Sequence, residues 1–337
     1  MNLFEPKLQW SLNEAKSDIF SVKFSKDQKL IGAALGNGNI GLYSGATGRL
    51  SYALPQSENR FPITCIRFHP VNSNTLYAVS AEGTISQWNT YKPQQLWSLQ
   101  EENNQLFALD ISANGNTFAT AGLDKIIRVY SAGTNQELLQ LSTSSYSGLN
   151  DDSSPHGHSN RIFSLKFNPN NENVLYSSGW DDTIQVWDIR TKSSIYTFFG
   201  SHVCSDSLDI SGNILVSGSW RTNNQIQLWD IRSYTEKQTM KWNSNHQCLV
   251  YALKIHPSGS YLVAGGSGSN EVAAFSLKSF SQIGKTIQMS SIVYSLTFSN
   301  DGKSLVIGTS NGDLASYLLN GTSTSDNASS EPFLTAP

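Results

Sequence analysis

The 337-residue sequence has no long apolar run, almost no net charge and few cysteines, and each of these absences excludes a class of protein. No segment approaches the roughly 20 consecutive apolar residues that a membrane-spanning helix needs. The first residues lack both the basic and the apolar region of a signal peptide. The 23 basic and 26 acidic side chains give a formal charge of −3, so no overall field would recruit nucleic acid or an anionic membrane. We therefore expect a cytosolic or nuclear protein.

Cysteine and histidine are too few and too scattered to indicate a metal or catalytic site. Cys65, Cys204 and Cys248 form an odd set without the spacing of metal ligands, and we expect buried free thiols in a reducing compartment. The six histidines supply no converging acid, base and nucleophile. No glycine-rich phosphate loop follows a strand and opens a helix. The sequence therefore predicts a protein that is not an enzyme and that uses neither a metal nor a cofactor.

What the sequence does contain is a repeat of about 43 residues. A large apolar residue recurs seven times, with an aliphatic residue two positions before it and a small residue three positions before it. The seven large residues are Phe24, Phe68, Ile111, Phe167, Ile210, Ile255 and Phe298. Alternation with a period of two is typical of a strand whose two faces meet different neighbours. Each repeat is therefore predicted to begin with such a strand.

A second recurring strand follows 19 or 20 residues later and contains an aromatic residue in every repeat. These aromatic residues are Tyr43, Trp88, Tyr130, Trp187, Trp229, Phe275 and Tyr317. Residues that favour tight turns, such as Asn37, Asp124 and Asp181, stand six positions before them. Four antiparallel strands at this period describe the blade of a β-propeller, whereas a helical solenoid would show a period of 3.6 residues.

Seven repeats predict an all-β protein with one seven-bladed β-propeller of four-stranded antiparallel blades over residues 1–320. The last repeat stops after its third strand, at Leu319, and residues 8–12 precede the first repeat with the character of a strand. We therefore expect the N-terminal strand to complete the last blade, which leaves no open ring. The predicted repeats span about 18–54, 62–99, 105–141, 158–199, 202–241, 246–286 and 291–319, with 8–12 joined to the last.

Two repeats carry motifs that resemble the signature of the WD-repeat family. The motifs are Gly157-His158, Asp181 and Trp187-Asp188 in the fourth repeat and Trp229-Asp230 in the fifth. The resemblance covers about residues 8–319, and the full motif occurs in the fourth repeat alone. Elsewhere the turn Asp is often Asn, Glu or Ser, and the histidine recurs at the matching distance only as His246.

The resemblance implies a hydrogen-bonded tetrad inside the fourth blade. It would join His158, a serine of the second strand, Asp181 and Trp187. The serine is Ser177 or Ser178, of which we select Ser178. Buried polar groups of this kind satisfy one another where water cannot reach them. The predicted role of the tetrad is structural.

Two segments depart from the repeat. The spacing between the third and fourth large apolar residues is longest because of a polar stretch at 142–157. By resemblance to the family this stretch is an inserted loop on the top face, either a tolerated insertion or a flap over a binding surface. Residues 321–337, rich in Ser, Thr and Asn, are predicted to be a disordered tail.

The position four residues before each large apolar residue is where the resemblance places the upper mouth of the central channel. It holds Phe20, Thr64, Phe107, Phe163, Asp206, Tyr251 and Tyr294. Trp180, Trp220 and Arg221 belong to turns that reach the same top face. Five aromatic rings and one carboxylate predict a receptor for a cationic, partly apolar side chain such as Arg or methylated Lys. The alternative is that the rings pack on one another and plug the channel mouth.

The predicted function is a non-enzymatic scaffold or adaptor that binds protein or peptide partners through this top face. We expect a monomeric propeller in a multiprotein complex, with no nucleic-acid or membrane partner. One alternative is a permanent subunit of a larger assembly, which should show apolar patches on several faces, including outer strands such as 50–54 and 96–99. A propeller glycosidase or lectin is a remote alternative.

Overall fold

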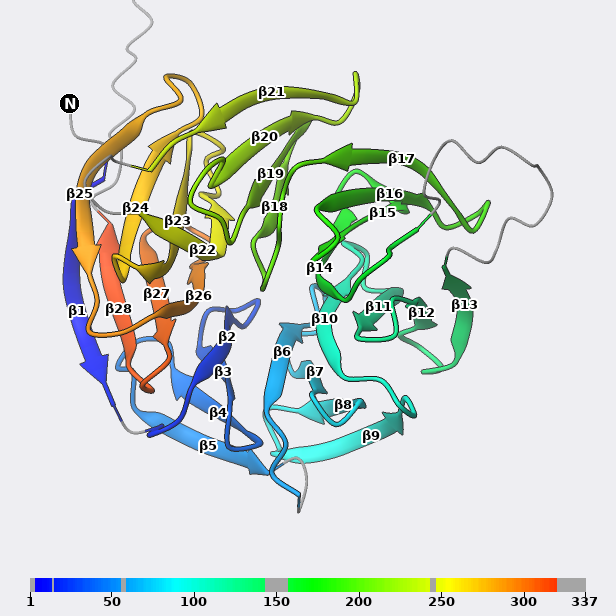
Figure 1. Ribbon diagram of the computed structural model, residues 1–337. Coiled ribbons are helices and arrows are strands. Elements are labelled where there is room, and N and C mark those ends of the chain that lie inside the picture. Colours follow the sequence, from blue (N-terminus) through cyan, green and yellow to red (C-terminus); the bar gives the residue numbers. More distant parts are fainter. Residues whose placement is uncertain (1–3, 14, 56–58, 143–156, 243–246, 320–337) are drawn as a thin grey trace, which may run out of the picture.

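Seven four-stranded antiparallel sheets stand as blades around a central axis, and Figure 1 shows the ring face-on. The computed structural model describes residues 4–13, 15–55, 59–142, 157–242 and 247–319. Within these ranges there is no helix, and hence no helix that could cross a membrane. The predicted fold class, an all-β propeller with seven blades, is confirmed.

Each blade has its first strand next to the axis and its last strand on the outside (Figure 1). Blade 1 consists of β2 (Ile19–Phe24), β3 (Leu30–Leu35), β4 (Asn39–Ser44) and β5 (Leu50–Pro55). Blade 2 consists of β6 (Ile63–Phe68), β7 (Thr75–Ser80), β8 (Thr84–Asn89) and β9 (Gln94–Gln100). Blade 3 consists of β10 (Leu106–Ile111), β11 (Thr117–Gly122), β12 (Ile127–Ser131) and β13 (Glu137–Leu141).

The remaining blades follow the same order. Blade 4 consists of β14 (Ile162–Asn168), β15 (Asn171–Gly179), β16 (Thr183–Asp188) and β17 (Ser193–Phe199). Blade 5 consists of β18 (Leu208–Ser211), β19 (Ile214–Gly218), β20 (Ile226–Asp230) and β21 (Thr235–Met240). Blade 6 consists of β22 (Cys248–Ile255), β23 (Tyr261–Gly268), β24 (Glu271–Ser276) and β25 (Gln282–Gln288). Blade 7 contains β26 (Val293–Phe298), β27 (Ser304–Thr309), β28 (Leu314–Leu319) and β1 (Pro6–Leu12).

The N-terminal strand closes the ring, as the sequence predicts. β1 pairs antiparallel with β28, from Pro6 opposite Leu319 to Leu12 opposite Leu314. Phe4, just before β1, is buried, and its carbonyl accepts a hydrogen bond of 3.1 Å from the backbone N–H of Lys285 in blade 6. The first strand therefore completes blade 7 and is also tied to its neighbour.

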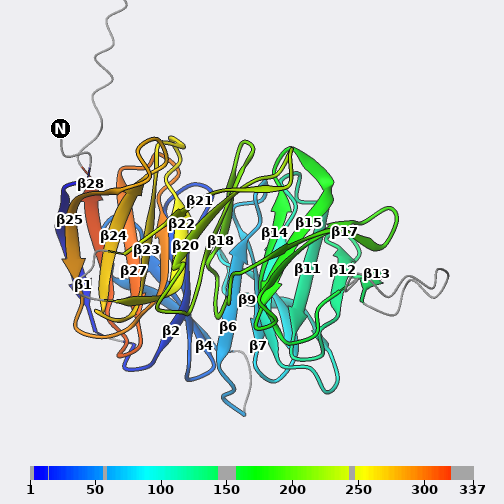
Figure 2. The same ribbon diagram turned by 45° about the horizontal axis from the view of Figure 1, so that its top comes forward.

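The hydrophobic core is divided into seven clusters, each between two neighbouring blades. The cluster that joins blades 7 and 1 contains Val306 and Leu314 on one side and Ile19, Val22 and Ile31 on the other. Because every blade buries both of its faces against neighbours, most residues of the three inner strands are apolar or small. The blades are thus stacked side by side around the disc that Figure 2 shows tilted.

Two histidines on the bottom face join neighbouring blades rather than form a reactive site. The Nε2 atom of His69 lies 3.0 Å from the carbonyl oxygen of Gly115, and that of His256 lies 3.0 Å from the carbonyl oxygen of Gly302. Both glycines have positive φ angles, +77° and +71°, and a Cβ atom at Gly115 would lie 2.3 Å from the imidazole of His69. Glycine is therefore required where the ring approaches the turn.

The predicted inserted loop and tail lie almost entirely outside the described residues. Of the loop at 142–157 only the two end residues belong to the described ranges, and the whole tail at 321–337 lies outside them. His246, the second histidine with the motif spacing, also lies outside them. These three predictions remain predictions.

Candidate functional site

A β-bulge in the innermost strand places the side chains at the top of the central axis. In six blades the pairing of the first and second strands shifts at one residue. The residues at these shifts are Phe20, Thr64, Phe107, Phe163, Tyr251 and Tyr294. Because a bulge inserts a residue without a partner and turns its side chain, these six residues can point away from both neighbouring blades.

Eight aromatic rings follow one another along the top face and form what we call the aromatic arc. In order they are Phe107, Phe163, Trp180, His202, Trp220, Tyr251, Tyr294 and Phe20. The distances between successive ring centroids run from 4.7 Å for the first pair to 6.5 Å between His202 and Trp220. These are the separations of favourable aromatic pairs. The sequence predicts seven of the eight rings, and His202 is the member that it missed.

The arc surrounds a half-open pocket of about 300 Å³ at the top of the axis. It is lined by Phe20, Pro62, Thr64, Ala81, Phe107, Phe163, Cys204, Ser205, Tyr251 and Tyr294. Thr64 stands where the arc is interrupted, and its hydroxyl lies 2.7 Å from the carbonyl oxygen of Leu106. The rings thus pack on one another, as the plug interpretation requires, and still leave a cavity between them.

Asp206 does not join the rings, so the prediction of a carboxylate at the rim is wrong. Blade 5 has no bulge in its first strand, which begins only at Leu208. Cys204 and Ser205 take the place at the pocket wall. The side chain of Asp206 instead makes ion pairs with Lys23, at 2.8 Å, and with Arg67, at 3.0 Å. The counter-charge that the sequence suggested for a cationic ligand is therefore already neutralised by the protein.

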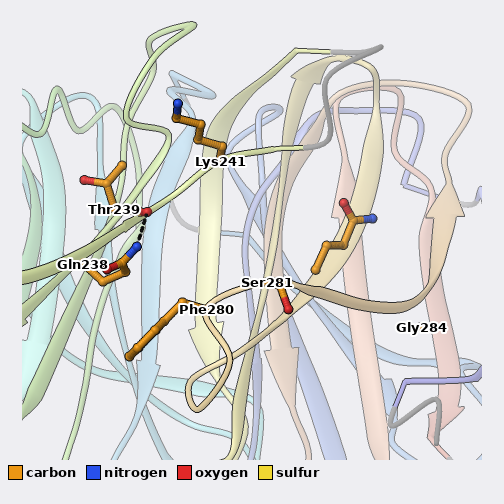
Figure 3. Close-up of a pocket in the computed structure, with 7 residues that line it drawn as sticks. Gln238, Thr239, Lys241, Phe280, Ser281 and Gly284 are labelled. Atoms are coloured by element: carbon orange, nitrogen blue, oxygen red, sulfur yellow. Dashed lines mark hydrogen bonds between the residues drawn. The ribbon is translucent and has the colours of Figure 1, made fainter.

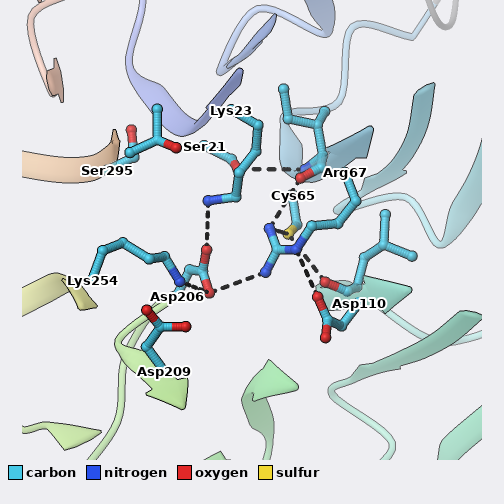
Figure 4. Close-up of polar contacts among 12 residues, drawn as sticks. Ser21, Lys23, Cys65, Arg67, Asp110, Asp206, Asp209, Lys254 and Ser295 are labelled. Carbon is cyan, nitrogen blue, oxygen red and sulfur yellow. Dashed lines mark hydrogen bonds and ion pairs between the residues drawn. The ribbon is translucent and has the colours of Figure 1, made fainter. Parts of the chain in front are cut away.

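Asp206 belongs to a group of charged side chains around the axis that we call the axial ion network (Figure 4). Its members come from the innermost strands and from the segment before β18: Lys23, Arg67, Asp110, Lys166, Asp206, Asp209 and Lys254. Asp206 alone contacts Lys23, Arg67 and Lys254, which come from blades 1, 2 and 6. Burial by itself would raise the pKa of Asp206, but the charges of these three cations outweigh this effect and hold the pKa well below its usual value.

Two other carboxylates of the network tie consecutive blades together through the backbone. Asp110 of blade 3 accepts a hydrogen bond of 2.9 Å from the N–H of Phe167 in blade 4. Asp209 of blade 5 accepts one of 2.9 Å from the N–H of Ile255 in blade 6. Because each carboxylate also pairs with a cation of another blade, Arg67 or Lys166, the network links all blades except the seventh.

The network makes the stability of the protein depend on pH in the alkaline range. Burial, together with the charges of Arg67 and Lys254, lowers the pKa of Lys23 from 10.5 to about 8 despite the ion pair with Asp206. Between these values the unfolded chain binds more protons than the folded one, so stability rises with pH. We expect Lys23 to add about 2 kcal/mol to the free energy of unfolding between pH 8 and 10. Urea unfolding measures this increase, which the Lys23→Met variant should lack.

The comparison of the two proteins isolates this effect. Burial raises the pKa of the Tyr77 hydroxyl and of the Cys204 thiol to about 12. The thiol therefore lowers stability above about pH 9 and the hydroxyl above about pH 10, in both proteins alike. If Lys23→Met retains the full increase between pH 8 and 10, the increase does not come from Lys23.

A second group of charges lies beside the two tryptophans of the arc. Asp182 accepts hydrogen bonds from Arg221, at 2.5 Å, and from the imidazole of His202, at 2.7 Å. Arg221, predicted as a partner-binding residue, is thus at the top face but is held by an ion pair. The guanidinium of Arg161 lies over the ring of Trp180, 4.7 Å from its centroid, which is a cation–π contact.

The tetrad of the fourth blade is present, and its serine is Ser177. His158 Nδ1 lies 2.7 Å from Asp181 Oδ2, and His158 Nε2 lies 2.6 Å from Ser177 Oγ. Trp187 Nε1 donates to the same hydroxyl oxygen at 2.7 Å. The choice of Ser178 was wrong because its side chain points to the other face of the strand, where its Oγ atom is buried and has no hydrogen-bond partner among the described residues.

The two serines provide a matched test of the tetrad. Ser177→Ala would leave the indole N–H of Trp187 and one imidazole nitrogen of His158 buried without partners, at a cost of about 2–3 kcal/mol. Ser178→Ala removes a hydroxyl that makes no hydrogen bond and should change stability by less than about 0.5 kcal/mol. Chemical unfolding of both variants checks this. Equal losses would mean that the hydrogen bonds of Ser177 add nothing to the blade.

A buried carboxylate in blade 3, not predicted from the sequence, replaces the histidine of the tetrad. Glu101 accepts hydrogen bonds from Thr120 at 2.6 Å, Tyr130 at 2.9 Å and Arg128 at 2.9 Å. A signal was present, because Glu101 precedes Thr120 by 19 residues, the same interval that separates His158 from Ser177. A search for polar residues at this spacing, without regard to residue type, would have identified Glu101.

A second pocket, of about 610 Å³, lies between the outer strands of blades 5 and 6 (Figure 3). Its wall is formed by Gln238, Thr239 and Lys241 of the one blade and by Phe280, Ser281, Gln282 and Gly284 of the other. It is wide and mostly polar, and none of its side chains belongs to a charged or aromatic cluster. The pocket of the aromatic arc is the better-formed site.

The described ranges contain no cluster of metal-binding side chains. No three side chains of His, Cys, Asp or Glu there could hold a metal ion. All three cysteines are free. Cys204, at the pocket wall, accepts a hydrogen bond from the indole of Trp180 at 2.8 Å, and burial raises the pKa of its thiol to about 12. At neutral pH this thiol is protonated and a poor nucleophile.

Comparison with known proteins agrees with the blade structure. The family described as WD domain, G-beta repeat matches residues 93–131, 152–188 and 236–271. With the seven closed blades and the tetrad of blade 4, these matches show that the chain is a seven-bladed β-propeller similar to the WD-repeat proteins.

Curated relatives of several kinds share this architecture. The chain is 24% identical over 308 residues to a guanine nucleotide-binding protein subunit beta from Zea mays, covering 82% of this chain and 75% of the relative. It is 27% identical to a striatin homolog and 25% identical to a serine-threonine kinase receptor-associated protein, both from Dictyostelium discoideum. Those two matches cover 59% and 60% of this chain, but only 24% and 61% of the relatives. Relatives of this type indicate a protein-interaction scaffold.

Proposed function

We propose that the top face is the docking surface for a protein partner and that the aromatic arc is its centre. The observation that carries this proposal is a continuous series of eight rings, five of which line a half-open pocket of about 300 Å³. Trp220, within this series, has 38% of its surface exposed. Clustered Trp and Tyr side chains next to a pocket are typical of the residues that contribute most to binding between proteins.

The relatives support this proposal in a general way. One is named as a subunit of a guanine nucleotide-binding protein and another as a protein associated with a receptor kinase, and both names describe proteins that act together with others. The predicted basic side chain as the bound group loses support, because the pocket wall contains no carboxylate.

Affinity purification with quantitative mass spectrometry tests the proposal. The tagged protein is compared with the double variant Phe163→Ala/Trp180→Ala, which removes two adjacent rings of the arc at 5.2 Å. Partners that dock on the top face should fall at least about tenfold, the loss that corresponds to truncation of a residue important for binding. Melting temperatures of both proteins are measured to show that the variant is folded.

Tyr91→Ala provides the matched control. This tyrosine is 75% exposed and lies in the turn between β8 and β9, at the end of β8 remote from the top face. Its removal should leave the captured partners unchanged. If the double variant melts like the parent and captures the same partners in the same amounts, the top face is not the docking surface.

A permanent subunit of a larger assembly is the second candidate, and one observation favours it. Outer strands of blades 1 to 4 carry exposed apolar side chains, among them Leu50, Tyr52, Leu96, Leu138 and Phe199. In this case Leu96→Ser/Leu138→Ser would abolish co-purification with the partners, whereas the arc variant would not. The same mass-spectrometric comparison separates the two candidates.

We also propose that the protein has no catalytic activity of its own and that it works in the cytosol or nucleus. Propellers of this family are typically scaffolds without catalysis, which supports the first proposal. The three free cysteines are compatible with a reducing compartment, which supports the second. Imaging of a tagged protein tests the location, and screening with glycoside substrates tests for the remote enzymatic alternative.

A further inference from the structure

The pocket of the aromatic arc has a wall without charged groups. None of its ten lining residues is Asp, Glu, Lys or Arg. Two of its polar side chains already have partners, because the hydroxyl of Thr64 bonds backbone carbonyls and the thiol of Cys204 accepts the indole N–H of Trp180. An apolar group can enter such a pocket without losing a hydrogen bond of its own, whereas a cation would lose water without gaining a counter-charge.

The charges beneath the pocket also oppose a cation. The axial ion network contains four cations, Lys23, Arg67, Lys166 and Lys254, and three carboxylates, Asp110, Asp206 and Asp209. Most members of the network follow the residue at the channel mouth by three positions on the same strand. They therefore lie up to about 10 Å further down the axis than the rings. One positive charge is therefore in excess below the floor, in an environment from which water is largely excluded.

The edge of the pocket carries a guanidinium that has no ion pair. Arg161 lies over Trp180, next to Phe163 at the pocket wall. Its Nε atom is buried without a hydrogen-bond partner, and no carboxylate of the described ranges is within 4.0 Å of its side-chain nitrogens. Arg221, by contrast, is paired with Asp182. A carboxylate from outside could therefore pair with Arg161 without displacing a partner.

From these three observations we infer that the pocket receives one apolar side chain of a partner peptide, an aromatic ring, Leu or Met, and that Arg161 binds an acidic residue near that side chain. The inference rests on the proposed function and replaces the basic side chain suggested by the sequence. A volume of about 300 Å³ is at the lower limit of ligand sites, which fits a single side chain. The rings of Phe163 and Trp180 lie between the pocket and the guanidinium of Arg161. An extended peptide would therefore span the distance from the pocket to Arg161 with two or three residues.

Selection from a random dodecapeptide phage library on the purified protein tests the inference. Phe163→Ala, with its melting temperature checked, serves for counter-selection, and Tyr294→Ala takes its place if that variant is unstable. A synthetic panel of dodecapeptides with trimethyl-lysine at the central position is measured alongside by fluorescence polarisation. We expect peptides with an aromatic residue, Leu or Met and an Asp or Glu two or three residues away, whose affinity falls at least about tenfold in the ring variant.

The outcomes separate the inference from the proposed function. Enrichment of Arg or Lys, or pocket-dependent binding of the trimethyl-lysine panel, would overturn the inference and leave the top face as the docking surface. If neither the library nor the panel yields a peptide whose binding depends on the rings, both are overturned.

The acidic residue of the peptide is tested by a second variant. Arg161→Gln should weaken binding of the selected peptides up to about fivefold, and it should not weaken the same peptides when their acidic residue is replaced by Ser. Arg232→Gln, which removes an exposed guanidinium at the opposite end of blade 5, is the control and should change neither. Equal effects of Arg161→Gln on both peptides would show that Arg161 does not bind the acid.

Discussion

Replacing Asp206 by asparagine is expected to lower the free energy of unfolding by about 3–5 kcal/mol. The substitution keeps the size of the side chain and removes the carboxylate charge that faces Lys23, Arg67 and Lys254. Three cations from three blades would then lie close together around the axis, and only Arg67 would keep an ion pair, with Asp110. A loss of this size corresponds to a fall in Tm of roughly 4–8 °C, measurable by calorimetry.

Two further variants show whether charge is the cause. Asp301→Asn, in an exposed ion pair with Lys303, should cost at most about 1 kcal/mol. Adding Lys254→Met to Asp206→Asn removes one of the unpaired cations and should restore part of the lost stability. If Asp206→Asn and Asp301→Asn melt alike, the axial ion network does not hold the blades together.

The same variant should change the response to acid. Since the folded protein holds the pKa of Asp206 well below the usual value of 3.8, the stabilisation is complete above the unfolded pKa, about 3.9. It is lost as the pH falls below that value toward the folded pKa. Between pH 4 and 2 the parent should therefore lose stability more steeply than Asp206→Asn.

Deletion of residues 4–12 is expected to be more severe and to cost at least about 5 kcal/mol, a large part of the total stability of a domain. The deletion removes the pairing with β28 from Pro6 to Leu12 and the buried side chain of Phe4. β28 would become an open edge, which is prone to pair with another chain. We expect a largely insoluble product, or one whose Tm falls well below that of the parent.

The matched control leaves the strand in place. Leu8→Ser alters a side chain of β1 that is 54% exposed and preserves the backbone pairing, so it should be nearly neutral. A synthetic peptide of residues 4–12 added to the deleted protein should raise its Tm progressively, roughly with the logarithm of the peptide concentration. A deletion variant that melts like the parent would show that β1 does not close the ring.

The fold could be predicted from the sequence because a seven-fold pattern of large, aliphatic and small residues fixes strand type and blade number together. Ring closure followed from arithmetic, since the last repeat lacks one strand. The error at Asp206 has a local cause. The position is equivalent in sequence to Phe163, but only blades with a bulge turn that residue to the rim, and nothing in the residue types marks blade 5 as lacking one.

The tetrad shows a similar limit. Ser177 and Ser178 lie on opposite faces of the same strand. Because both are serines, the residue type does not indicate which of the two faces the tetrad. Glu101 was missed because a carboxylate can replace the imidazole as a hydrogen-bond acceptor for Thr120 and Tyr130, so the geometry persists while the motif disappears. His202 entered the aromatic arc unnoticed because it lies in the irregular segment before β18.

Ring closure by β1 has a consequence for how the protein is made. Pro6 leaves the ribosome long before the residue opposite it, Leu319, which lies some three hundred residues later. At synthesis rates of 5–20 residues per second, β1 waits roughly 15 to 60 s before its partner strand exists. During that interval the six earlier blades can form one after another, but the disc stays open at one side. The first strand of the propeller to be synthesised is therefore the last to be placed, and the cell must keep it from pairing elsewhere until β28 has been made.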